Sequence, residues 1–251
     1  MDENYIFGRN AITQLLMEEN PKLSKIFLSF ASSGSSINKI FSLAKQHKIP
    51  VSKMDNRKFK DLEKRIGCDP RHSQGVIALK ELVQTLDDTT LFQRALKNHT
   101  NPIIVALDNI EDPHNLGAIA RTVECSGASG ILISEKNSSP ITPTAIKVST
   151  GALEIIDVAS VGKLGISLEN AKEMGFWVIG TDLDADKDYT DNVYDRPVIL
   201  VIGSEGKGMR PIIKKKCDMI IKIPMKGKIN SLNASVSSAI ILYERLRQVS
   251  A

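Results

Sequence analysis

Three polar, glycine-containing loops hold the residues whose types best suit chemistry. They span residues 107–127, 201–210 and 223–236, and each follows a short apolar run typical of a buried strand. In parallel α/β sheets such loops meet at the carboxyl edge, which is where nucleotides bind. The sequence therefore predicts a ligand site built from three separate loops.

The third loop joins an apolar run, residues 219–223, to a helical pattern over residues 234–248. Pro224 ends the run as a strand, because proline has no N–H to donate to a neighbouring strand. Ser231 and Asn233 are typical N-cap residues and predict the start of the helix beside the loop. Taken alone, this stretch is also typical of an ordinary strand-to-helix turn.

The second loop contains Gly-Ser-Glu-Gly-Lys-Gly at residues 203–208. It lacks the Walker A pattern and the GxGxxG pattern, which argues against a P-loop and against a Rossmann dinucleotide site. Closely spaced glycines allow the backbone to approach a flat, polar ligand such as an adenosine. This loop therefore favours recognition of a nucleoside by backbone groups.

The first loop leads into a helix that Asn115 is expected to cap. Gly117, Arg121 and Glu124 fall on one face of this helix. We expect that face to combine a small opening, a cation and a carboxylate. Alternatively, Arg121 and Glu124 form a surface ion pair, which stabilises a helix by only roughly 0.2–0.5 kcal/mol.

Together the three loops closely resemble, in order and spacing, the three motifs of the SpoU (TrmH-like) class of SPOUT RNA ribose 2′-O-methyltransferases. Three ordered motifs are far more specific than one glycine-rich loop. The resemblance is nearest to bacterial large-subunit rRNA guanosine 2′-O-methyltransferases and covers nearly the whole chain. The matching residues are Asn115-Leu116-Gly117 with Arg121, Gly203-Ser204-Glu205-Gly206 with Gly208, Ile223-Pro224-Met225 with Ser231-Leu232-Asn233, and His72-Ser73-Gln74-Gly75-Val76.

The resemblance implies S-adenosylmethionine as the cofactor, held largely by the backbone of these loops. The implied main contacts are Gly203, Ile223 and Leu232, and the implied secondary contacts are Thr181, Glu205, Gly206 and Met225. No metal is expected, since the four histidines are scattered and suggest no zinc site.

Methyl transfer from a sulfonium to a ribose hydroxyl needs two aligned reactants and the removal of a weakly acidic proton. The resemblance implies that Arg121 acts at the 2′-hydroxyl. Because arginine stays protonated, we expect Arg121 to orient a phosphate and to stabilise alkoxide charge. Asn115, Glu205, Ser231 and Asn233 are then expected to orient the ribose, Arg121 or the cofactor.

The fold that the resemblance implies is α/β: a C-terminal SPOUT domain whose parallel sheet carries a trefoil knot, after a small L30e/L7Ae-like RNA-binding domain. Arg9, Arg71 and His72 are implied RNA contacts, although each alone is typical of a solvated surface. The class is dimeric, with the cofactor site near the interface. An apolar stripe over residues 236–246 fits either the core or a dimer surface.

The chain has 251 residues, 42% of them hydrophobic, which suits one large or two modest domains. We expect a substrate-binding domain over residues 1–80, a linker over 81–101 and a catalytic domain over 102–251. Within the catalytic domain, residues 154–159 are predicted as a strand and residues 182–191 as an exposed, mobile acidic loop.

Charge is unevenly distributed along the chain. Residues 1–80 carry 14 Lys+Arg against 8 Asp+Glu, whereas residues 81–251 carry 19 against 21. A basic first domain fits an anionic polymer such as ribosomal RNA, although a solvated basic surface explains the same charge. No apolar run approaches the roughly 18–20 residues of a membrane helix, and no signal peptide is evident. We therefore expect a cytoplasmic protein without a membrane partner.

Two other functions fit the same residues. One is a tRNA ribose methyltransferase, and the other is a non-catalytic RNA-binding or ribosome-assembly module that keeps the loops for folding. The presence of Arg121, Asn115 and Ser231-Leu232-Asn233 favours an enzyme. The N-terminal module favours rRNA as the substrate.

Overall fold

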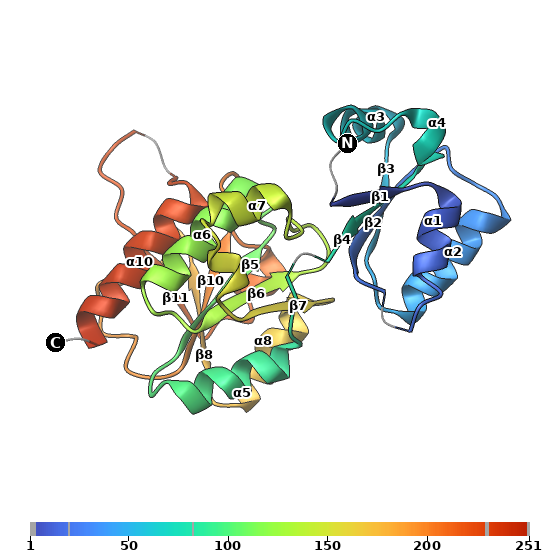
Figure 1. The fold of residues 1–251 in the computed structure, drawn as a ribbon. Coiled ribbons are helices and arrows are strands. Elements are labelled where there is room, and N and C mark those ends of the chain that lie inside the picture. The colour runs from blue at the N-terminus through green and yellow to red at the C-terminus, as the bar shows by residue number, and fades with distance from the viewer. Residues whose placement is uncertain (1–3, 20, 82, 229–230, 250–251) are drawn as a thin grey trace. The chain divides into compact units, whose positions relative to one another are not determined.

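The computed structural model describes residues 4–19, 21–81, 83–228 and 231–249, and it divides into two compact units, Met1–Leu82 and Val83–Ala251. The first unit contains a four-stranded sheet in the order β1-β4-β2-β3, in which only β2 and β3 are parallel. Helices α1 and α2 pack on one face and α3 on the other (Figure 1). Its elements are β1 (Tyr5–Phe7), α1 (Arg9–Leu15), β2 (Leu23–Ser29), α2 (Ser35–Gln46), β3 (Val51–Met54), α3 (Asn56–Arg65), α4 (Pro70–Ser73) and β4 (Val76–Lys80).

The second unit is built on a seven-stranded sheet in the order β7-β6-β5-β10-β8-β11-β9, and every pair of neighbouring strands is parallel. The α/β class and the parallel sheet are therefore confirmed, while the trefoil knot stays a prediction. The elements are α5 (Asp88–Asn98), β5 (Ile103–Asp108), α6 (Pro113–Cys125), β6 (Gly130–Ser134), α7 (Pro143–Val148), the 3₁₀ helix η1 (Ala152–Glu154), β7 (Val158–Val161), α8 (Leu164–Glu173), β8 (Trp177–Thr181), β9 (Lys187–Asp188), β10 (Val198–Gly203), α9 (Pro211–Lys214), β11 (Met219–Lys222) and α10 (Ala234–Val249).

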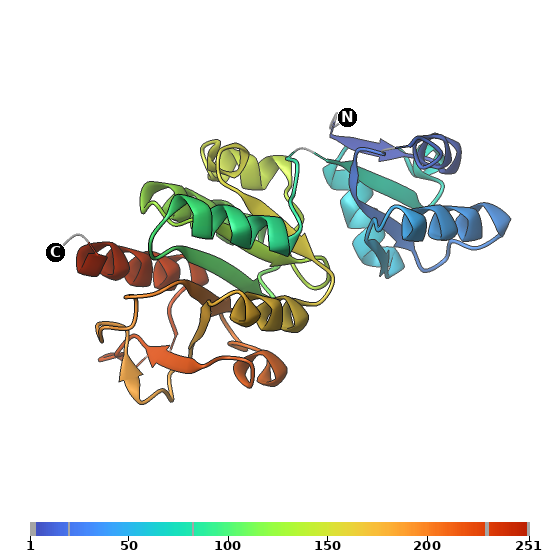
Figure 2. The same cartoon turned by 90° about the horizontal axis from the view of Figure 1, so that it is seen from below.

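Helices cover both faces of this sheet, which explains why its central strands are apolar throughout. Helices α6, α7 and α10 pack on one face, and α5, α8 and α9 pack on the other (Figures 1 and 2). In β5, Ile103, Val105 and Leu107 face the first layer of helices, and Ile104 and Ala106 face the second.

The structure corrects three local predictions. The helix after the first loop begins at Pro113 and is capped by Asp112, so Asn115 lies inside its first turn and is not the cap. Residues 154–159 do not form one strand, because η1 occupies the beginning of this stretch and β7 starts only at Val158. Residues 182–191 are not simply an exposed loop, since Ala185 is buried and β9 pairs with β11.

Residues 83–101, which fall in the expected linker, pack against the second unit. Leu86 forms a parallel bridge with Ala159 at the edge of the sheet. Leu91 and Phe92 of α5 are fully buried in the core on that side. This segment therefore contributes to the core of the second unit.

Gly117 serves packing and forms no opening on the surface of α6, which is a further correction. A Cβ atom at Gly117 would lie 2.6 Å from the carbonyl oxygen of Ala145 and 2.8 Å from Cβ of Val148. Helix α7 therefore closes the space that the sequence assigned to an opening, because only glycine allows this close approach of two helices.

We predict that Gly117→Ala lowers the free energy of unfolding by roughly 1–3 kcal/mol, the usual cost of overpacking a core. Gly165→Ala in α8 is the matched control, since its new Cβ would meet Ile213 at an ordinary 3.6 Å. Urea denaturation should show Gly165→Ala as stable as the wild type or more so, because alanine favours helix. Equal stability of the two variants would contradict the close packing of α6 on α7.

Candidate active site

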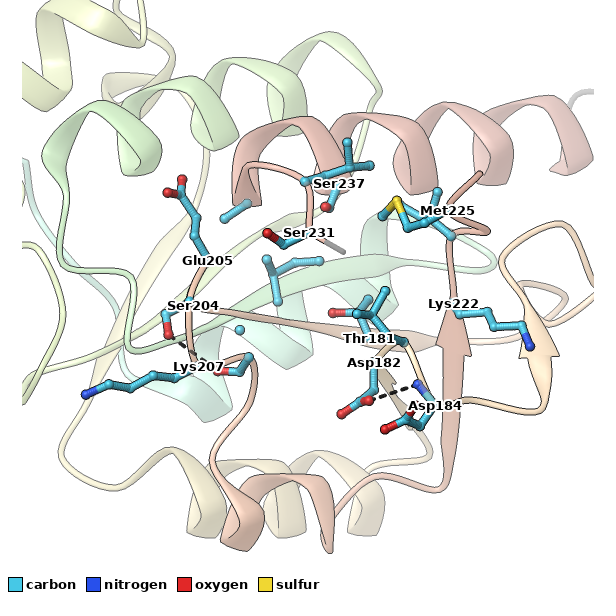
Figure 3. Close-up of a pocket in the computed structure, with 18 of the residues that line it drawn as sticks. Thr181, Asp182, Asp184, Ser204, Glu205, Lys207, Lys222, Met225, Ser231 and Ser237 are labelled. Carbon is cyan, nitrogen blue, oxygen red and sulfur yellow. Dashed lines mark hydrogen bonds between the residues drawn. The ribbon is translucent and has the colours of Figure 1, made fainter. Parts of the chain in front are cut away.

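A cavity of about 490 Å³ lies at the carboxyl edge of the second unit's sheet (Figure 3). It is formed where β8, β10 and β11 end, which is the usual position of ligands in parallel α/β sheets. All seven residues named as cofactor contacts, Glu205 among them, lie in its lining, as does Ser231. The lining residues are Thr181, Asp182, Leu183, Asp184, Ile202, Gly203, Ser204, Glu205, Gly206, Lys207, Gly208, Ile221, Lys222, Ile223, Met225, Ser231, Leu232, Ala234 and Ser237.

A buried ion pair holds the second loop against the end of β5. Asp108 is fully buried, and its carboxylate accepts bonds from the backbone N–H and the Nε of Arg210, each at 2.7 Å. Nη2 of Arg210 also lies 2.6 Å from Oδ1 of Asp108. This pair was not predicted, although an acidic residue that ends a wholly apolar strand signals the need for a cationic partner.

The second loop folds back on itself directly after β10. The backbone N–H of Ser204 donates to the carbonyl of Gly208 at 3.2 Å, and the N–H of Gly208 donates to Ser204 at 2.8 Å. A Cβ at Gly203 would lie 2.3 Å from the carbonyl carbon of Gly208, so the fold of the loop itself requires glycine there. A Cβ at Gly206 would meet no heavy atom within 4 Å, which leaves the tip of the loop open.

Three predicted catalytic residues from three separate segments, the first turn of α6 and the second and third loops, form one hydrogen-bonded cluster. The Nδ2 group of Asn115 donates to Oε1 of Glu205 at 2.9 Å. The Nδ2 group of Asn233 donates to Oδ1 of Asn115 at 2.9 Å and also to Oε1 of Glu205. The two amides thus fix one carboxylate oxygen at the edge of the cavity.

Asn233 also caps α10, as the sequence predicts. Its Oδ1 accepts from the backbone N–H of Ser235 at 2.9 Å and from that of Val236 at 3.4 Å. One side chain therefore sets both the start of α10 and the position of Glu205. Ser231 lines the cavity but does not cap the helix, which corrects the second half of that prediction.

Arg121 lies apart from the cluster within this chain. It is exposed on α6, and among the described residues no hydrogen bond or ion pair involves its side chain. It lies six helical positions beyond Asn115, which corresponds to about 9 Å along the axis and about 120° around it. Arg121 and Glu124 form no ion pair in the described chain, so the alternative of a surface pair receives no support.

The acidic side of the cavity was not predicted from the sequence. Asp182 and Asp184 line it, and Figure 3 shows both beside Thr181. Oδ2 of Asp182 lies 2.7 Å from Nζ of Lys214, and Oδ1 accepts from the N–H of Asp184 at 3.1 Å. Partial burial raises the pKa of Asp182, but the bond from Lys214 and the backbone N–H groups outweigh burial and lower this pKa below its usual value.

In the first unit, Arg9, Arg71 and His72 line one cavity of about 340 Å³. The Arg9 guanidinium donates to the carbonyl oxygens of Gln74 and Ser33, at 3.1 and 3.3 Å, and so connects the start of α1 to two loops. Arg71 pairs with Asp69 at 2.7 Å, and this hydrogen-bonded guanidinium lowers the pKa of Asp69 to about 2. The structure therefore brings the three predicted RNA contacts together, with two of them already engaged.

Two classes of feature are absent from the described residues. No group of three or more His, Cys, Asp or Glu side chains there could hold a metal ion. No helix in the described parts of the chain is long and apolar enough to cross a membrane.

Comparison with known proteins supports the family that the three motifs indicated. The SpoU rRNA methylase family matches residues 102–243, and a family described as RNA 2′-O ribose methyltransferase substrate binding matches residues 5–86. YacO of Bacillus subtilis, named as a TrmH family tRNA/rRNA methyltransferase, is 38% identical over 98% of this chain and 96% of its own. The 23S rRNA (guanosine-2′-O-)-methyltransferase RlmB of Pseudomonas putida is 33% identical over 97% of this chain and 96% of its own.

A solved structure supports the fold. The SpoU methyltransferase AviRb from Streptomyces viridochromogenes, solved in complex with AdoMet, has a TM-score of 0.61 at 23% identity and covers 98% of this chain and 90% of its own. The resemblance inferred from the motifs is thus confirmed. The chain belongs to the SpoU rRNA methylase family and is an S-adenosylmethionine-dependent RNA methyltransferase.

Proposed function

We propose that this enzyme methylates the ribose 2′-hydroxyl of a guanosine in large-subunit ribosomal RNA. The observation that carries the proposal is the cluster of Asn115, Glu205 and Asn233 at the edge of a nucleoside-sized cavity. The similarity to RlmB over nearly the full length, including the basic first unit, favours rRNA over tRNA. A cytoplasmic location follows from this substrate.

The cavity fits an adenosyl cofactor. Its volume of about 490 Å³ lies within the roughly 300–1,000 Å³ of small-molecule sites. Gly206 leaves backbone groups accessible, and the carboxylates of Asp184 and Glu205 offer acceptors for hydroxyl groups. Gly203, Ile223 and Leu232, with Thr181, Gly206 and Met225, would hold S-adenosylmethionine, which supplies an activated methyl group when bound.

The cluster and Arg121 would have different tasks in the reaction. Asn115 and Asn233 keep Glu205 in one orientation, and Ser231 would help to orient the target ribose, which is the positioning that displacement reactions require. Arg121 stays protonated, so it would bind a substrate phosphate and stabilise the charge that develops on the 2′-oxygen. Arg9, Arg71 and His72 of the first unit would contact the RNA elsewhere.

We also propose that the protein is a homodimer that uses the exposed side of α10. Val236 and Tyr243 are 45% and 51% exposed and lie seven residues apart on one face, while Ile241 and Leu242 are buried in the core. The sequence left this stripe as either core or interface, and the exposed half fits an interface. A second copy would cover apolar side chains that otherwise face water.

The proposal is tested by incubating the protein with tritiated S-adenosylmethionine and either unmodified 23S rRNA or tRNA. Labelled 2′-O-methyl groups are then mapped by their resistance to alkaline hydrolysis. We expect label at one guanosine of the rRNA. Label on tRNA alone would overturn the rRNA assignment, and RNA binding without label on either would favour a non-catalytic module.

Arg121→Ala should lower the rate of methyl transfer roughly 10²–10³-fold, because it removes a charge that acts on the transition state. Its affinity for S-adenosylmethionine, measured by calorimetry, should stay within about twofold, since Arg121 does not line the cavity. Arg94→Ala on α5 is the control for losing an exposed arginine. Wild-type turnover by Arg121→Ala would disprove its role.

Two substitutions of Asn233 separate its tasks. Asn233→Asp keeps the oxygen that caps α10 but places a carboxylate against Glu205, whereas Asn233→Ala removes both the cap and the cluster. We expect only Asn233→Ala to lose about 1 kcal/mol of unfolding free energy through the cap, and both variants to lose methyl transfer. Full activity of Asn233→Asp would show that the cluster is not needed.

Replacing Val236 and Tyr243 together by lysine should convert the dimer into a species of 27.5 kDa in sedimentation equilibrium, because two charges cannot be buried without partners. Ile166→Lys, at a 51% exposed site on α8, should leave the mass unchanged. A wild-type protein that already sediments at 27.5 kDa would refute the dimer.

A further inference from the structure

The net charge of the second unit is small, but one segment of this unit is strongly basic. Residues 203–233 carry 8 Lys+Arg against 2 Asp+Glu, so the other residues from 81 to 251 carry 11 against 19. The basic segment contains the second and third loops of the cavity and the elements between them. The positive charge of this unit is therefore concentrated in the segment that carries two of the cavity's loops.

Part of that charge is used inside the structure. Arg210 pairs with Asp108, Lys214 with Asp182, and Lys216 with Glu169. Each of these cations holds a named carboxylate and contributes to the fold of the unit. They are poor candidates for contacts with a polyanion.

Three lysines on the two loops are different. Lys207, Lys226 and Lys228 are exposed, and none of them forms an ion pair within the described chain. Lys207 lines the cavity, and Figure 3 shows its side chain extending away from the cavity centre. Lys226 directly follows Met225, another lining residue.

The acidic residues nearby do not neutralise these lysines. The carboxylate of Glu205, two residues from Lys207, is bonded to the amides of Asn115 and Asn233. Asp184 lies across the cavity from Lys207, beside Thr181 (Figure 3). The two loops therefore present three flexible, solvated ammonium groups that suit phosphates as point charges.

We propose that Lys207, Lys226 and Lys228 bind the RNA phosphates that flank the target nucleotide, so that the catalytic unit holds the RNA by its own loops. This inference rests on the proposed function, since it places RNA at the edge of the same cavity. A target ribose that reaches the cavity brings its neighbouring phosphates to the two loops that carry these lysines, one of which, Lys207, lines the cavity. Each contact releases counterions from the RNA, which makes binding sensitive to salt.

The test compares the wild type with Lys207→Gln/Lys226→Gln/Lys228→Gln. Binding of an unmodified 23S rRNA transcript is titrated over a range of salt concentrations, and affinity for S-adenosylmethionine is measured by calorimetry. The triple variant should reduce the slope of log K against log salt by about 2, at about 0.7 for each single-strand phosphate contact. The KM for RNA should rise, while kcat and the cofactor affinity stay near the wild-type values.

The matched control is Lys97→Gln/Lys136→Gln/Lys163→Gln, which removes the same charge from exposed lysines on the side of the sheet formed by β5, β6 and β7. Its salt slope should equal that of the wild type. An unchanged slope in the loop variant would overturn the inference, as would weaker cofactor binding with unchanged RNA binding, because the lysines would then serve the cofactor. A reduced slope in a protein that methylates no RNA would support the phosphate contacts and refute the proposed function instead.

Discussion

The buried pair of Asp108 and Arg210 is the constraint on which the site depends. A carboxylate without access to solvent is stable only with a cationic, hydrogen-bonded partner, and removing one member of such a pair typically costs about 3–5 kcal/mol. Here the partner comes from the loop after β10, which neighbours β5 in the sheet. The pair therefore fixes the base of the loop that carries Glu205.

From that base, short-range constraints place the chemistry. The two backbone hydrogen bonds between Ser204 and Gly208 close the loop. Because Gly203 has no side chain, the backbone of Gly208 can pack tightly against it. Glu205 then stands where Asn115 and Asn233 reach it from segments 90 and 28 residues away. Because Asn233 also caps α10, the same amide links the catalytic cluster to a helix with an exposed apolar face.

Local patterns in the sequence were sufficient to predict the strands and the helix start that position the site, and the family resemblance identified the residues of the cluster. The apolar runs predicted β5 and β10, which are buried on both faces, and β11, which is partly buried, and the cap signal of Asn233 is local. The failures concern long-range contacts. No local sequence pattern around Asp108 indicates that Arg210 is its partner. Likewise, no local pattern around Gly117 indicates that α7 packs against it. Asp182 and Asp184 were predicted to lie in an exposed acidic loop, because only the tertiary structure places them beside β11 and the cavity.

Hydrogen exchange of the wild-type protein with and without S-adenosylmethionine locates the cofactor site without any substitution. We predict slower exchange of backbone amides in residues 181–184, 203–208 and 223–228, which line the cavity or adjoin its lining. We predict no change around residues 7–11 and 71–74 of the first unit. Protection confined to the first unit, or absent from residues 203–208, would contradict the placement of the cofactor in this cavity.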